Sequence, residues 1–326
     1  MARGWLSRFA PLLVVLAGIA LLLYPTVSNL IIEQNASHVV QRYGEAVEVM
    51  SDEERREILD AARAYNAALA QREGVTSGEA DGAQTASPEE REQVLAGYDE
   101  VLNLDGNGLM GYISIPRIDV TLPIYHGVEE RVLQQAVGHV EGTSLPVGGS
   151  SAHAVLSGHR GLPSAKLFTD LDEMQVGDVF YIRVLEEVHA YQVDGIEAVL
   201  PDETESLAIV PGEDRVTLVT CTPYGINSHR LLVHAHAIPY TAEMESEVGR
   251  TGNFINIPLP YLMLIIGLVA IAVALVTLRV WSGRRGASEG RAATDDGAAA
   301  AGHSGDGPSG VAKRGRFQRK DGSRDG

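Results

Sequence analysis

Two long apolar runs without a charged residue limit what this chain can fold into. The first, FAPLLVVLAGIALLLYPTVSNLII, covers Phe9–Ile32 and follows Arg3 and Arg8. The second, IPLPYLMLIIGLVAIAVALVTL, ends just before Arg279. A helix of about 20 apolar residues crosses the roughly 30 Å of hydrocarbon in a bilayer. The sequence therefore predicts two transmembrane helices, over the first run and over residues 257–281.

Basic residues flank both runs on the sides that face the chain ends. Because Lys and Arg are retained in the cytoplasm, both termini, residues 1–8 and 282–326, are predicted to be cytoplasmic and the middle extracellular. The expected location is the cell membrane, with two spans. A cleaved signal peptide is the alternative for the first run. That run, however, is longer than the core of about 7–15 residues usual in signal peptides and ends in no clear cleavage site.

Charge is distributed unevenly along the chain. The net charge is −17, and the two ends together carry +6, which leaves about −23 between the apolar runs. So acidic a segment is repelled by phosphate backbones, which argues against nucleic acid as a partner. The tail after Trp281 is rich in Gly, Ala and Ser and ends in KRGRFQRKDGSRDG, which predicts a disordered cytoplasmic segment near anionic lipid.

Residues 33–110 predict an extracellular helical extension. Apolar residues recur at helical spacing in ASHVVQRYGEAVEVM, and a second amphipathic helix is predicted from about Asp52 to Gln71. Ser51 and Glu54 form a capping-box pattern between the two helices.

A flexible, lid-like loop is predicted next. Residues 74–88, GVTSGEADGAQTASP, are small and polar. A short helix is predicted to restart at about Pro88, since proline is favoured in a first helical turn.

Residues 111–240 change to short β-branched runs separated by turn residues, the pattern of strands. Helical inserts are predicted near Glu129 (EERVLQQAV) and near Ser164 (SAKLFTDLDEM). The pattern predicts a mainly β domain, a mostly antiparallel barrel or sandwich with helical decoration, followed by a linker over residues 241–256. The predicted strands are GYISIP, IDVTLPIYHG, AHAVLSGH, DVFYIRVL, AYQVDGIEAV, RVTLVTC and RLLVHAHAI.

The run VTLVTC ends in Cys221, the single cysteine of the chain. Outside the membrane structural cysteines usually pair as disulfides, so a lone thiol requires a reason. TPYG follows at once, which places the cysteine where a strand gives way to a turn. Such a position exposes a side chain on a rigid backbone, as a nucleophile requires. The alternative is a small buried hydrophobic residue.

A thiol with a reference pKa of about 8.5 needs a neighbouring base or cation to react near neutral pH. His159, in AVLSGHRGLP, lies at another predicted strand end and is the first candidate. His234 and His236 share one strand face and suggest a metal pair, but no third ligand lies close, so no metal and no cofactor is expected. The competing histidines are His153, His229, His234 and His236.

Arg230 lies nine residues after Cys221, across the loop TPYGINSH and at the start of the next predicted strand. A hairpin of that length returns the arginine beside the cysteine. A guanidinium there could donate hydrogen bonds to an oxyanion. An ordinary surface residue is the alternative.

Together these residues resemble the sortases, membrane-anchored cysteine transpeptidases of Gram-positive bacteria. The segment TLVTCTPYGINSHRLLVHA looks like the TLxTC…R strand, loop and strand of that family. Three more segments, LSGHRGLPSAKLFTDLDEMQVGD, GYISIPRIDVTLPIYHG and GHVEGTSLPVGG, resemble the pilus-assembling branch, class C. The resemblance covers roughly residues 36–240, and the two predicted spans suit it.

The resemblance implies a closed eight-stranded β-barrel with an N-terminal helical extension. It also implies the catalytic residues: His159 as the histidine, Cys221 as the nucleophile and Arg230 as the arginine. The implied substrate is a pilin with an LPxTG-like sorting signal, cleaved between Thr and Gly through a cysteine thioester. The implied acceptor is a lysine amine of the next pilin, and hydrolysis by water is the side reaction.

Two other functions remain open. One is a sortase that attaches surface proteins to a cross-bridge amine of peptidoglycan. The other is a catalytically idle scaffold that binds sorting signals without forming a thioester.

The predicted loop departs from class C. Many members carry an Asp-Pro-aromatic motif in a lid over the site, whereas here Asp81 precedes Gly82 and no aromatic residue follows in GEADGAQ. Asp81 is therefore not assigned to the site, and the hypothesis is a loose or absent lid.

Overall fold

A computed structural model describes residues 2–72, 87–244, 267–269 and 271 of the chain. The chain divides into two compact units. One consists of Leu16–Leu259 and contains every strand described below; the other consists of Met1–Val15 with Pro260–Gly326.

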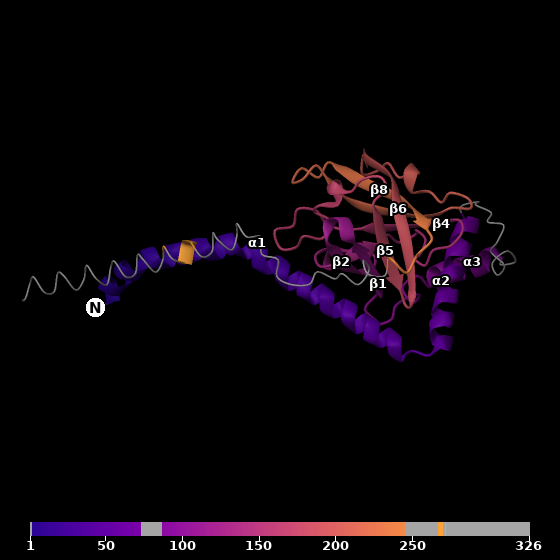
Figure 1. Cartoon of the computed structure of the whole chain (residues 1–326), viewed down its shortest axis with the longest axis horizontal. Helices are drawn as coiled ribbons and strands as arrows, with labels where there is room; N and C mark the ends of the chain where they lie inside the picture. Colours follow the sequence, from indigo (N-terminus) through magenta and orange to yellow (C-terminus); the bar gives the residue numbers. More distant parts are fainter. Residues whose placement is uncertain (1, 73–86, 245–266, 270, 272–326) are drawn as a thin grey trace, which may run out of the picture. The chain divides into compact units, whose positions relative to one another are not determined.

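Eight strands close into a barrel in the order β1-β2-β3-β4-β7-β8-β6-β5 (Figure 1). This confirms the predicted barrel and rules out the open sandwich. The neighbours β2 and β3, and likewise β4 and β7, run parallel, while all other neighbours are antiparallel. The strands are β1 (Leu109–Ile115), β2 (Val120–His126), β3 (Val137–His139), β4 (Ala152–Ser157), β5 (Val179–Val184), β6 (Glu187–Val199), β7 (Asp214–Thr222) and β8 (His229–Ile238).

Strand β3 is the one that the residue pattern missed. It has three residues, too few for alternation to be visible, and all three are buried. It is nevertheless required for closure, because it pairs with β2 on one side and with β4 on the other.

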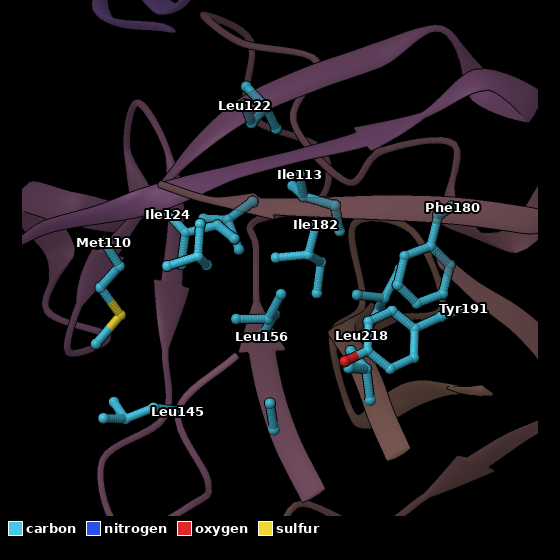
Figure 2. Close-up of a cluster of buried hydrophobic side chains, with 14 of the residues drawn as sticks. Met110, Ile113, Leu122, Ile124, Leu145, Leu156, Phe180, Ile182, Tyr191 and Leu218 are labelled. Carbon is cyan, nitrogen blue, oxygen red and sulfur yellow. The ribbon is translucent and has the colours of Figure 1, made fainter. Parts of the chain in front are cut away.

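The barrel is filled by side chains that alternate inward along each strand. In Figure 2, Ile113, Ile182 and Leu156 come from three strands and meet in the interior. At one side Phe180 and Tyr191 stack with ring centroids 5.7 Å apart. Val216 and Leu218 of β7 are also fully buried and belong to the same core.

Three helices precede the barrel: α1 (Ala2–Val49), α2 (Asp52–Arg72) and α3 (Pro88–Ala96), of which α2 and α3 lie against each other (Figure 1). The predicted capping box is present, with Ser51 N donating to Glu54 at 2.8 Å and Glu54 N donating to the Ser51 hydroxyl at 3.2 Å. Tyr43 of α1 is buried, and its hydroxyl donates to Met110 O at 3.0 Å and accepts from Leu185 N at 2.7 Å. These bonds fix α1 to the barrel.

The two predicted helical inserts fare differently. The first is a single turn, α4 (Glu130–Leu133). The second, predicted near Ser164, is wrong: Leu167 has φ of 43°, a left-handed conformation that stops a helix. Only a 3₁₀ turn, η2 (Leu171–Glu173), forms there. The buried Leu167 and Phe168 are held by packing against the barrel rather than by helical periodicity.

Among the residues that the structure describes, no helix has the length and apolar character needed to cross a bilayer. The predicted second span, the linker from residue 245 and the tail lie outside the described residues, apart from 267–269 and 271. The predicted loop lies outside them as well, except for Ser87 and Pro88, where Ser87 caps α3 by accepting from Glu90 N.

His139 generates a prediction about pH. The ring is fully buried, donates from Nε2 to Ser144 O at 2.8 Å and lies 2.9 Å from the Tyr98 hydroxyl through Nδ1. Burial lowers the pKa of His139 to about 4, so the fold requires the neutral ring. Stability is therefore complete above about pH 6.5 and is lost as pH falls toward 4, by about 2.5 kcal/mol between pH 7 and 4.5.

The measurement is urea unfolding at both pH values, followed by circular dichroism. A His139→Gln variant should start less stable at pH 7 but lose about 2.5 kcal/mol less on acidification. Equal acid losses in the two proteins would assign the effect to other groups.

Candidate active site

The β7–β8 hairpin places the predicted cysteine and arginine side by side. The strands are antiparallel, and Cys221 is the direct register partner of Arg230. Directly opposed residues have Cβ atoms about 4.5–5.5 Å apart on the same face. The turn between them is closed by Ile226 N and Asn227 N, both donating to Pro223 O at 3.0 Å. Cys221 is half-buried. The turn fixes the register that places Cys221 opposite Arg230.

His159 reaches the same end of the barrel by a parallel pairing. Strands β4 and β7 run parallel, with Ser157 opposite Val219. Just beyond that pair Gly158 N donates to Val219 O at 3.0 Å, and the Thr220 hydroxyl donates to Gly158 O at 2.7 Å. His159 directly follows Gly158, and Cys221 directly follows Thr220. The structure thus brings together all three predicted residues at one barrel end.

The segment after His159 is held by backbone and side-chain contacts. Phe168 N donates to His159 O at 3.1 Å, and the Phe168 ring is fully buried. Arg160 forms an ion pair with Asp172 and donates to the Thr222 hydroxyl at 3.4 Å. Its guanidinium also lies 5.9 Å from the ring centre of Tyr224. Arg160 therefore links the histidine segment to the cysteine turn.

A carboxylate faces the histidine from α4. His159 Nε2 lies 3.2 Å from Glu130 Oε2, and Gln134 Nε2 donates to Glu130 Oε1 at 3.1 Å. The hydrogen bond from Gln134 and the contact with His159 lower the pKa of Glu130 below its usual range. The carboxylate is therefore ionised near neutral pH.

The competing histidines contact other partners, although His229 lies opposite Thr222 at the same end of the barrel. His153 and His234 both contact the Thr217 hydroxyl, at 2.7 and 2.8 Å, four residues before the cysteine on β7. His236 contacts Asp194 at 3.1 Å, and His229 contacts the neighbouring Ser228 hydroxyl at 2.8 Å. His234 and His236 thus bind different partners. Over the described ranges, no group of three His, Cys, Asp or Glu side chains is arranged to hold a metal ion.

Two residues of this site were not predicted from the sequence, Arg160 and Glu130. Arg160 follows His159 directly, so its position in HRG was a usable signal. Glu130 lies 29 residues before the histidine, within the predicted insert EERVLQQAV, and nothing in the spacing pairs the two. Asp81, left out of the site on sequence grounds, lies outside the described residues.

The arrangement has a definite chemical capacity. A thiol at a strand end, a histidine able to exchange protons and an arginine with donors for an oxyanion are the parts of a cysteine site for acyl transfer. Comparison with known proteins tests this class.

A profile of the sortase domain matches residues 113–238. Among curated relatives, sortase A of Bacillus anthracis is 32% identical over 136 residues, covering 41% of this chain and 63% of that protein. Sortase A of Streptococcus agalactiae serotype III (strain NEM316) is 30% identical over 166 residues, covering 50% and 61%. The chain thus spans less than two thirds of the length of these relatives.

Solved structures are more similar. Sortase C1 from Streptococcus agalactiae is 44% identical, with a TM-score of 0.55, and the match covers 63% of this chain and 100% of that one. Sortase C of Streptococcus pneumoniae, a structure described in terms of pilin substrate specificity, is 43% identical with a TM-score of 0.50, covering 63% and 98%. The chain belongs to the sortase family, and these relatives support the class C resemblance drawn from its residues.

Gly158 directly precedes His159 and packs against the Phe168 ring, which allows a test of this packing. A Cβ added there would lie 2.7 and 2.8 Å from Phe168 Cδ2 and Cγ, and that ring cannot move because it is fully buried. Gly158→Ala should therefore lower the free energy of unfolding by about 1–3 kcal/mol, the usual cost of overpacking. Urea unfolding measures it.

Gly195→Ala is the matched control. Gly158 follows the last residue of β4 and Gly195 lies within β6, but the nearest atom to a Cβ added at Gly195 is 3.6 Å away, an ordinary contact. A loss in the control as large as in Gly158→Ala would contradict the steric explanation.

Proposed function

We propose that this protein is a membrane-anchored cysteine transpeptidase that cleaves an LPxTG-like sorting signal and joins pilins. The observation that carries the proposal is the direct register pairing of Cys221 with Arg230, with His159 at the end of the adjacent parallel strand. The 42–46% identity to sortases C and C1 supports the pilus-assembling class.

In the first half-reaction His159 carries the proton of the Cys221 thiol, and Cys221 Sγ attacks the carbonyl carbon of Thr in the Thr–Gly bond. A C–S bond forms, the C–N bond breaks, and the glycine amine takes a proton from His159. In the second half-reaction a lysine amine of another pilin attacks the thioester. It gives a proton to His159, a C–N bond forms, and the thiolate leaves.

Arg230 is suited to stabilise the negative oxygen of both tetrahedral intermediates. Its guanidinium donates to the carbonyl oxygens of Asn227 and His229, at 3.4 and 3.2 Å. Among the described residues no carboxylate lies within 4.0 Å of it. Its positive charge is therefore not neutralised by an ion pair, and the planar fork retains donors for an oxyanion.

The membrane arrangement belongs to the proposal. Residues 9–32 and 257–281 span the bilayer, the segment 33–256 with its barrel is extracellular, and both termini are cytoplasmic. What supports it is the pair of uncharged apolar runs with basic flanks in the sequence. A pilin precursor held in the same membrane then reaches the site by lateral diffusion in the bilayer.

Replacing the nucleophile tests the reaction. Cys221→Ala should abolish the ladder of covalently linked pilin on denaturing gels, because no thioester forms. A pilin whose acceptor lysine is replaced by alanine is the control for the second half-reaction. A ladder that persists with Cys221→Ala contradicts the proposal.

The same assay separates the alternatives. Cell-wall attachment that continues without the acceptor lysine favours a peptidoglycan cross-bridge as acceptor. An idle scaffold would bind an LPxTG peptide without a mass increase on Cys221, which intact-mass measurement detects.

Replacing the arginine tests the oxyanion role. Arg230→Lys keeps the charge but loses the planar fork, so kcat for peptide cleavage should fall by about 10²–10³, as for the loss of an oxyanion-hole donor. Alkylation of Cys221 by iodoacetamide forms no oxyanion and serves as the control, with an expected change under about twofold. Unchanged cleavage by the lysine variant would remove the oxyanion role.

A further inference from the structure

Glu130 lies at the start of α4 and faces the ring of His159. The two atoms in contact are Glu130 Oε2 and His159 Nε2, 3.2 Å apart. The histidine side chain is 26% exposed and the glutamate 67% exposed. Within residues 2–72 and 87–244, no other carboxylate lies within 4.0 Å of a His159 ring nitrogen.

The short helix that carries Glu130 is fixed to the barrel. Gly138 of β3 packs so close beneath it that an added Cβ would lie 2.3 Å from Gly127 O and 3.2 Å from Leu133 Cδ2. Gly127 N also donates to the buried Tyr98 hydroxyl at 3.2 Å. The chain just before α4 and the Leu133 side chain at its end therefore both pack against the barrel, and the exposed carboxylate projects from between them.

The charged residues next to Glu130 and His159 form ion pairs with other residues. Glu129 pairs with Arg131 at 3.7 Å, and Arg160 pairs with Asp172. Gln134, one turn along, orients Glu130 by donating to its other oxygen at 3.1 Å. Glu130 of α4 thus faces the histidine, while Cys221 of β7 and Arg230 of β8 lie opposite each other at the same end of the barrel.

We propose that Glu130 is the positioning residue of His159: it accepts a hydrogen bond from Nε2–H and leaves Nδ1 as the nitrogen that moves protons. The inference rests on the proposed function and deepens it. The geometry gives Glu130 no contact with the reacting atoms, so it acts through the histidine. An acceptor on one ring nitrogen fixes both the tautomer and the ring orientation. The lowered pKa of Glu130 keeps that acceptor ionised near neutral pH.

The expected effect is moderate. General acid–base catalysis contributes about 10²–10⁴-fold, and a carboxylate in contact with water supplies only part of the orientation. Glu130→Ala should lower kcat of transpeptidation by about 10-fold with KM for the sorting peptide unchanged. Glu130→Gln retains an oxygen acceptor and should fall between this variant and the wild type. Glu129→Ala, the adjacent carboxylate that pairs with Arg131, should behave as the wild type.

A second readout does not depend on catalysis. Full-length protein in detergent micelles, labelled with ¹⁵N-histidine, reports the tautomer of His159 from its ring nitrogen shifts, assigned with a His159→Gln variant. We expect the Nε2–H form in the wild type and in Glu130→Gln, and a mixture of both tautomers in Glu130→Ala. Glu130→Gln preserves volume and keeps the test available even where the alanine variant folds poorly.

The outcomes separate the two proposals. A kcat of Glu130→Ala within twofold of the wild type, an unchanged tautomer, or an equal loss in Glu129→Ala each overturns the positioning role. A wild-type protein that forms no thioester with the peptide overturns the proposed function instead. In that case the tautomer measurement on the resting protein still decides whether Glu130 holds His159.

Discussion

The hydrogen bonding of β7 on both edges is the constraint on which the site depends. On one edge β7 pairs parallel with β4, and on the other it pairs antiparallel with β8. The first pairing brings the end of β4, and with it His159, to the cysteine. The second brings Arg230. Because side chains alternate with a period of two, a slip of one residue in either pairing would move a candidate residue to the opposite face of the sheet.

A polar row across the outer face holds those registers. Burial lowers the pKa of His153, so its ring is neutral, and its Nδ1 donates to Ala208 O at 2.9 Å. Its Nε2 must then accept from the Thr217 hydroxyl, whose oxygen accepts from His234 Nδ1. His234 Nε2 continues the row to Glu197 at 3.2 Å. One side chain from each of β4, β7, β8 and β6 takes part, and a shifted strand would leave buried polar atoms without partners.

The sequence predicted the contacts between residues close together in the chain and missed those that depend on tertiary packing. Cys221 and Arg230 are joined by a single short turn, so their proximity was accessible from loop length alone. The capping box at Ser51 is local in the same sense. The three-residue strand β3 was not predictable, because it exists only through its partners on both sides. The contact between Glu130 and His159 also depends on tertiary packing, since it joins an insert to a strand end.

The histidine is supported from the helical extension as well as from the barrel. Tyr98, which follows α3, places its hydroxyl between His139 of β3 and the backbone of Gly127, just before α4. Burial raises the pKa of Tyr98, so the hydroxyl keeps its proton as a donor. Since α4 carries Glu130, the contacts run without interruption from the extension through α4 to His159. An extension linked in this way can support His159 without covering the candidate site, which suits a sequence whose residues 74–88 lack the lid motif of class C.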